Sequence, residues 1–199
     1  LFDARGSSDH EGDLTSYAWD FDDGTLSSER TVVHNFTDDG IYNVTLTVAD
    51  SDDVEDMVWT EIVVENRDPV LIYLLDYEGK EEGANIGAGD EITFSASGSY
   101  DKDGTIKTFY WDFGVTGGDS WDEEAAYTYQ NRDTYTVTLT ITDNDNAETS
   151  ASFDVSVANK VPVIDLKVDK VTALTHTEIN FDASGTKDLD PTGQITSFA

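Results

Sequence analysis

The strongest constraint on the fold of this chain is an internal repeat with a period near 90 residues. Three matched pairs define the spacing: Trp19 and Trp111 at 92 residues, Tyr42 and Tyr135 at 93, and Asn66 and Asn159 at 93. A unit of this length is too long for a solenoid repeat and suits an immunoglobulin-sized β-sandwich. We therefore expect an incomplete first repeat (1–66), a complete second repeat (67–158) and the opening of a third (159–199), all within a longer secreted polypeptide.

Within each repeat, large apolar residues alternate with small polar ones. The clearest stripes are Tyr42, Val44, Leu46 and Val48 in the first repeat, and Tyr135, Val137, Leu139 and Ile141 in the second. A period of two is typical of a strand with one buried face. Turn-forming pairs such as Asp103-Gly104 separate these runs, and no long run shows helical spacing. The sequence therefore predicts an all-β fold of tandem immunoglobulin-like sandwiches.

The charge of the chain excludes several classes of partner. Its 42 acidic and 11 basic residues give a net charge of −31. Nucleic acid binding needs Lys and Arg, and an anionic membrane surface would repel this chain. The absence of Cys excludes a disulfide scaffold and a thiolate metal site, and no apolar run is long enough for membrane insertion. Two interpretations of the acidic residues stay open and are compatible: a solvated surface suited to high salt, or clusters that bind Ca²⁺.

Three stretches resemble the PKD (polycystic kidney disease) domain family: Ser99-Tyr100-Asp101-Lys102-Asp103-Gly104-Thr105-Ile106, Phe109-Tyr110-Trp111-Asp112-Phe113-Gly114, and Tyr135 through Asp143. The resemblance implies a β-sandwich found in tandem in cell-surface and secreted proteins, including archaeal surface-layer proteins and accessory domains of secreted hydrolases. The chain departs from the family's usual Gly-Asp-Gly after Trp-Asp-Phe, with Asp22-Asp23-Gly24 in one repeat and Gly114-Val115-Thr116-Gly117 in the other. These departures fall in loops and affect local turns.

Carboxylates and amides near the expected repeat joints are candidate metal ligands. The resemblance implies a Ca²⁺ site where a linker Asn, a loop Asp and a strand-end Asp converge. Carried over by motif, the candidates are Asn66, Asp101 and Asp143 in the second repeat, Asn159 and Asp188 in the third, and Asp9 and Asp50 in the first. Oxygen ligands of this kind suit Ca²⁺. The alternative is that these Asp residues only cap turns between strands.

Other polar and aromatic positions are candidates for modification or for binding. Asn35 and Asn43 each begin an Asn-x-Thr sequon, and strand parity predicts that both side chains are exposed. Both are therefore candidates for N-glycosylation, and the alternative is that they stay unmodified. Trp59 and Trp121 are less easily placed on a stripe than Trp19 and Trp111 are. An exposed indole of this kind can stack on a sugar ring.

No catalytic motif accompanies these features. The chain has no Gly-x-Ser-x-Gly, no His-Glu-x-x-His and no glycine-rich phosphate loop, so we expect no enzymatic activity; a pair of acidic residues acting on a glycosidic bond is the catalytic alternative. The leading expectation is an extracellular structural or adhesive rod at the cell surface, stiffened by Ca²⁺, with neighbouring repeats, other surface proteins or further copies as partners. The rival is a polysaccharide- or protein-binding accessory module of a secreted hydrolase.

Overall fold

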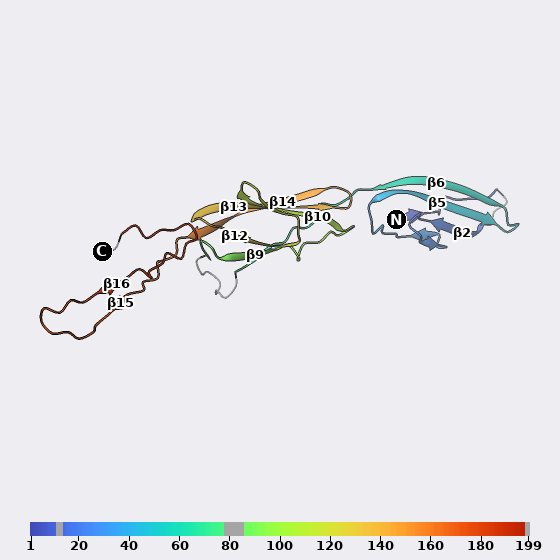
Figure 1. Cartoon of the computed structure of the whole chain (residues 1–199). Coiled ribbons are helices and arrows are strands. Elements are labelled where there is room, and N and C mark those ends of the chain that lie inside the picture. The colour runs from blue at the N-terminus through green and yellow to red at the C-terminus, as the bar shows by residue number, and fades with distance from the viewer. Residues whose placement is uncertain (11–13, 78–85, 198–199) are drawn as a thin grey trace. The chain divides into compact units, whose positions relative to one another are not determined.

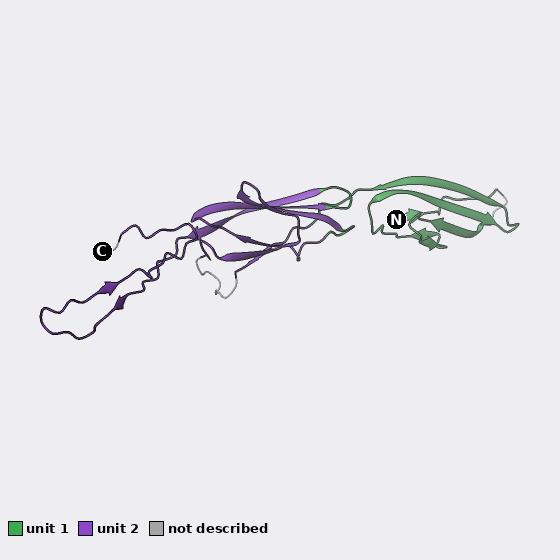
Figure 2. Cartoon of the chain, in the orientation of Figure 1, with its two compact units in different colours: residues 1–69, 101–105, 143–147 green, residues 70–100, 106–142, 148–199 purple. Residues whose placement is uncertain are grey.

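The structure, a computed structural model, describes residues 1–10, 14–77 and 86–197. They form two compact units (Figure 2): unit 1 contains residues 1–69, 101–105 and 143–147, and unit 2 contains residues 70–100, 106–142 and 148–199. Every regular element in the described residues is a β-strand, which confirms the expected all-β class (Figure 1). None of these residues belongs to a helix long and apolar enough to cross a membrane.

Unit 1 is built on a four-stranded antiparallel sheet in the order β3-β2-β5-β6, with β1 and β4 paired separately. The strands are β1 (Phe2–Asp3), β2 (Leu14–Asp20), β3 (Leu26–Ser27), β4 (Thr31–Val32), β5 (Gly40–Asp50) and β6 (Glu55–Val64). Its core contains Trp19, Phe21, Val44 and Leu46, as the alternation predicts. The Trp19 indole N–H donates to the Glu29 carbonyl at 2.9 Å, so the buried ring keeps a polar partner.

Unit 2 contains a five-stranded sheet, β11-β10-β13-β14-β8, and a three-stranded sheet, β12-β9-β7. The strands are β7 (Leu74–Asp76), β8 (Ile86–Gly87), β9 (Glu91–Ser95), β10 (Ile106–Val115), β11 (Gly118–Ser120), β12 (Glu124–Thr128), β13 (Asp133–Asp143) and β14 (Glu148–Ala158). The short strand β8 runs parallel to β14, whereas β13–β14, β9–β12 and β7–β9 pair in the antiparallel direction.

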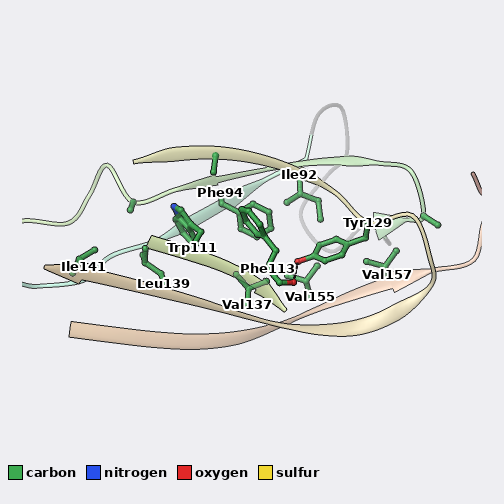
Figure 3. Close-up of a cluster of buried hydrophobic side chains, with 13 residues drawn as sticks. Ile92, Phe94, Trp111, Phe113, Tyr129, Val137, Leu139, Ile141, Val155 and Val157 are labelled. Carbon is green, nitrogen blue, oxygen red and sulfur yellow. Dashed lines mark hydrogen bonds between the residues drawn. The ribbon is translucent and has the colours of Figure 1, made fainter. Parts of the chain in front are cut away.

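Side chains from both sheets of unit 2 form one core (Figure 3). Phe94 from β9 packs against Trp111 and Phe113 from β10, with ring centroids 5.6 and 5.0 Å apart. The inward stripe of β13, at Val137, Leu139 and Ile141, is fully buried. The Trp111 N–H donates to the Asp122 carbonyl at 3.2 Å, which matches the bond made by Trp19 in unit 1. The two sandwiches therefore share one way of burying their central tryptophan.

The described residues after Lys160 form little regular structure. β15 (Lys167–Val168) pairs with β16 (Phe181–Asp182), and Val163 makes a bridge with Lys187. Many apolar side chains of this segment are exposed, from Val168 at 37% to Val171 at 94%. The three-way division of the chain, including the opening of a third repeat, stays a prediction.

Candidate functional site

The loop after β13 is held by the carboxylate of Asp143. Asp143 Oδ1 accepts hydrogen bonds from the N–H groups of Asp145 at 2.9 Å and Ala147 at 2.8 Å. Asp50 makes the same pair of bonds in the first repeat, to Asp52 at 2.8 Å and Val54 at 3.0 Å. Both loops also place one Asp or Asn at positive φ, a conformation that these residues tolerate. The turn-capping role considered for these aspartates is therefore present in the structure.

Asp143 has a second partner, the linker residue Asn66. The carboxyl of Asp143 is fully buried, and the Asn66 side-chain Nδ2 donates to its Oδ2 at 2.9 Å. Burial opposes ionisation of this carboxyl, but the hydrogen bonds from Asn66, Ala147 and Asp145 together lower the pKa of Asp143 below its ordinary value. Asp143 is therefore held as a buried anion, and the predicted pairing of linker and strand end is observed.

Three further oxygen atoms near this pair are buried and lack a hydrogen-bond partner among the described residues: Asn66 Oδ1, Asp101 Oδ2 and Asp103 Oδ1. A buried oxygen without a partner is costly unless a cation or water satisfies it. All of these residues, with Asp143, belong to unit 1. The described residues contain no group of three His, Cys, Asp or Glu side chains that could hold a metal by themselves. One of the three unpartnered oxygens, Asn66 Oδ1, belongs to an amide and not to a carboxylate.

Asp103 was not among the residues singled out from the sequence. One of its oxygens is an unpaired buried atom, and the other lies 4.0 Å from Arg67 Nε. The available signal was the repeated Asp-x-Asp spacing, because Asp188 and Asp190 follow the same pattern 87 residues later. The resemblance implies a ligand role for the first carboxylate of each pair, Asp101 or Asp188, and none for the second.

The loop that carries Asp101 and Asp103 is tied to the loop that follows Asp143. The Asn144 side-chain Oδ1 accepts from the Thr105 N–H at 2.7 Å, and the Asn144 N–H donates to the Thr105 carbonyl at 3.0 Å. A side chain at Gly104 would collide with Asn144, so glycine permits this approach. Two hydrogen bonds between Asn144 and the Thr105 backbone therefore join the two loops.

The other predicted ligand sets are not assembled in the same way. In the third repeat, Asp190 is buried and accepts from the Lys160 N–H at 2.8 Å, while Asp188 accepts from the Asp190 N–H at 3.1 Å. The Asn159 side chain instead donates to the Lys160 carbonyl at 2.9 Å. In the first repeat, Asp9 and Asp50 line one pocket together with Val54 and Glu55, and the Asp50 carboxylate also caps its own loop.

Both sequon asparagines, Asn35 and Asn43, are exposed, as their parity predicts. Asn43 lies on the outward side of β5, directly opposite Glu61 of β6. Glycosylation of the two sites stays a prediction.

Trp59 and Trp121 are also exposed, at 60% and 65%. Trp121 packs beside Tyr110, with ring centroids 4.6 Å apart and an angle of 44° between the rings. Trp59 lies on the outward side of β6, directly opposite Thr45 of β5. Neither ring belongs to a core, so both are open to a ligand.

Comparison with known proteins identifies the family to which the chain belongs. A family model described as "PKD domain" matches residues 1–64 and 80–157, which is more than half of the chain. The chain belongs to the PKD domain family. PKD domains are non-catalytic modules, so family membership supports the expectation that this chain is not an enzyme.

The PKD repeats are similar to short parts of several curated proteins. Collagenase ColQ1 of Bacillus cereus (strain Q1) is 35% identical over 97 residues, which are 49% of this chain and 10% of that protein. Collagenase ColA of Clostridium perfringens is 42% identical over 50 residues, 25% of this chain and 4% of that protein. Pre-pro-metalloprotease PrtV of Vibrio cholerae is 48% identical over 44 residues, 22% of this chain and 5% of that protein. The chain thus matches a tenth or less of the length of each relative.

Two solved structures of single PKD domains are also similar. The PKD1 domain of Vibrio anguillarum Epp is 27% identical, covers 47% of this chain and 96% of its own, and superposes with a TM-score of 0.38. The PKD1 domain of Vibrio cholerae metalloprotease PrtV is 27% identical, covers 46% of this chain and 98% of its own, and gives a TM-score of 0.38.

Proposed function

We propose that the chain is a non-catalytic accessory module of a larger extracellular hydrolase. The observation that supports this most directly is that its PKD repeats match short segments, 4–10% of the full length, of proteins named as collagenases and a metalloprotease. In such a protein the chemistry belongs to another part of the polypeptide. The PKD repeats contribute a surface that binds or positions a large substrate.

This proposal replaces the structural rod as the leading interpretation. The relatives named above carry hydrolase names, and none carries the name of a surface-layer or filament protein. The large negative charge is compatible with either role, because it favours solubility in both. The accessory module is therefore the better supported of the two.

Deletion of both repeats from the parent protein tests the proposal. We expect turnover of a small soluble substrate to stay within about twofold, while turnover of an insoluble polymeric substrate falls at least about tenfold, because binding to the polymer is lost. A matched fall on both substrates would place the repeats in the catalytic machinery. Full activity on the polymer after deletion would contradict an accessory role.

We further propose that Asn66, Asp101, Asp103 and Asp143 bind one Ca²⁺. The support is the set of buried oxygens without partners, which is unfavourable unless a hard cation satisfies it. Bound Ca²⁺ would supply a positive charge among three carboxylates and would order the linker together with the loops at 101–105 and 143–147.

The thermal midpoint of the chain in Ca²⁺ and in EDTA tests this second proposal. Binding to the folded state alone adds about 2.7 kcal/mol when free Ca²⁺ is 100 times Kd. Asp101→Asn and Asp103→Asn should abolish this increment, and in EDTA both should match or exceed the wild-type midpoint, because each removes one negative charge from a cluster of buried oxygens. Asp119→Asn, an exposed carboxylate on β11, is the matched control and should keep the full increment. An identical wild-type midpoint in Ca²⁺ and EDTA would refute calcium binding.

A further inference from the structure

The outward side of β5 and β6 in unit 1 carries an unusual set of side chains. Strand pairing places Thr47 opposite Met57, Thr45 opposite Trp59, and Asn43 opposite Glu61. These six residues, which we call the outer face, alternate with the inward stripe of Val44 and Leu46 and therefore share one side of the sheet. Met57 and Trp59 are 62% and 60% exposed, so large apolar side chains meet water here.

The corresponding strands of unit 2 show what this side of the sheet contains when it only faces solvent. There, Thr136 bonds Asp154 at 2.8 Å, Thr138 bonds Ser152 at 2.9 Å, and Thr140 bonds Ser150 at 2.8 Å. Each threonine of β13 thus has a polar partner directly across on β14. In unit 1 the partners of Thr47 and Thr45 are Met57 and Trp59, so the polar ladder is replaced by apolar side chains.

Strands that cover the inward side of this sheet leave its outward side exposed. In unit 2, residues such as Tyr73 and Ile86 cover the inward side of β14, and Tyr73 stacks on Phe153 at 4.3 Å. The outward residues Ser150, Ser152 and Asp154 nevertheless stay exposed with all those strands in place. The equivalent positions Met57, Trp59 and Glu61 are therefore outward in any complete repeat.

Because unit 1 lacks these cross-strand threonine bonds, hydrogen-bonding groups stay available on the outer face. Neither the Asn43 side chain nor the Thr47 hydroxyl has a partner among the described residues, and the Thr45 hydroxyl makes one long bond of 3.4 Å to the Asn43 carbonyl. A hollow of about 560 Å³ adjoins Thr45 and Thr47 and is also lined by Asp20 and Leu26. Trp59 does not line this hollow, but strand pairing places it opposite Thr45, with the Asn43–Glu61 pair two residues along on the same side.

These side chains form a row that crosses the whole sheet. Leu26 is opposite Asp20, Asp20 is opposite Thr45, and Thr45 is opposite Trp59, so the row spans four strands. At the usual spacing between neighbouring strands, its length is about 14 Å. A row of this length accommodates an extended ligand of a few rings in contact with both apolar ends.

We propose that the outer face of unit 1 binds a neutral polysaccharide, a proposal that rests on the accessory role given above. The C–H face of a sugar ring packs on an exposed indole, and its hydroxyls bond to the hydroxyl, amide and carboxylate groups around Trp59. Neutrality follows from charge, because Asp20 and Glu61 are acidic, the outer face carries no Lys, Arg or His, and the chain has a net charge of −31. An anionic glycan would be repelled.

Binding of the intact 199-residue chain to neutral polysaccharides tests the proposal. The probes are soluble arabinoxylan and glucomannan in affinity gels, and amorphous cellulose and chitin in sedimentation assays, with type I collagen as a protein comparison. We expect retention on at least one polysaccharide and a loss of at least about tenfold in affinity for Trp59→Ala. Trp121→Ala, an equally exposed tryptophan on unit 2, is the matched control and should bind like wild type.

A second variant separates the sugar contact from any change in folding. Thr45→Val removes a hydroxyl at nearly constant shape and should weaken binding severalfold, with urea unfolding unchanged. Three outcomes overturn the proposal: no binding to any of the four polysaccharides, binding to collagen alone, or binding that is lost in Trp121→Ala and kept in Trp59→Ala. None of them affects the deletion test, so the accessory role can survive the failure of the glycan site.

Discussion

The first and second repeats agree in the inward residues of their central strands, β2 and β5 in one and β10 and β13 in the other, and differ on the outward side of the strands β6 and β14. Both bury a tryptophan whose N–H reaches a backbone carbonyl, and both close a hairpin with an Asp that accepts two N–H groups. On the outward side, a ladder of Thr–Ser and Thr–Asp bonds in unit 2 gives way to Met57 and Trp59 in unit 1. Packing density restricts the inward positions, whereas outward positions are free to change without loss of the fold.

This difference separates the residues that make the sandwich from those that can carry a function. Core positions tolerate few changes, because each buried side chain touches many neighbours. Outward strand positions need only a residue of good β-propensity, which Trp, Thr and Met provide at little energetic cost. One scaffold can therefore present two different surfaces in tandem.

The largest expected effect compares two tryptophans in opposite environments. Trp111→Ala, at a side chain with 0% exposure, should lower the free energy of unfolding of the second repeat by about 3–5 kcal/mol. Trp59→Ala removes an exposed ring and should change stability by no more than about 0.5 kcal/mol. Urea unfolding of the two variants measures both values. Similar losses in both would show that Trp59 is part of a core and would contradict its assignment to the outer face.

The lowered pKa of Asp143 predicts how the stability of the fold changes at acid pH. Because folding lowers the pKa of Asp143, its ionised form stabilises the fold above the ordinary aspartate pKa of 3.8, and this contribution is lost as the pH falls below that value. The Asp143→Asn variant has no ionisable carboxyl at this position, so its stability lacks this pH-dependent contribution. In EDTA, the difference in unfolding free energy between wild type and Asp143→Asn should therefore shrink as the pH is lowered from 6 to 3. A difference that is constant with pH would mean that this carboxyl is not held as a buried anion.

A small effect on stability is also expected from transferring one surface to the other repeat. Ser150→Met, Ser152→Trp and Asp154→Glu would place the β6 side chains of the outer face on β14. Because the changed positions are exposed, stability should change by about 1 kcal/mol or less, while the lost threonine bonds leave hydroxyls free. In a Trp59→Ala background, this triple variant should regain part of the polysaccharide binding. A stable variant that regains none would show that the remaining contacts of the outer face, such as Asp20 and Leu26, are indispensable.

Much of this arrangement follows from the sequence, because the alternation of side chains carries most of the information. The stripes at Val44 and Leu46 and at Val137 and Leu139 are buried as expected. The pairing of Asn66 with Asp143 was also expected from the motif. Both depend on local parity or on a repeated motif, which a single sequence displays directly.

Other features depend on register and could not be obtained in this way. The sequence leaves the placement of Trp59 open, and strand pairing places it opposite Thr45 and in one row with Asp20. In the third repeat, the acidic loop accepts from the Lys160 backbone, and the Asn159 side chain turns elsewhere. A motif specifies the residue types at a joint, and the tertiary structure decides which of their atoms meet.

The most direct test of the division between a shared core and a specialised outer face is NMR mapping of the intact chain with cellohexaose, N-acetylchitohexaose, xylohexaose and mannohexaose as probes. We predict saturable shifts with at least one of them at the Trp59 indole N–H and at the amides of Thr45 and Thr47, with little change at Ser150, Ser152 and Asp154. Shifts confined to unit 2, or no shift with any of the four sugars, would contradict the account.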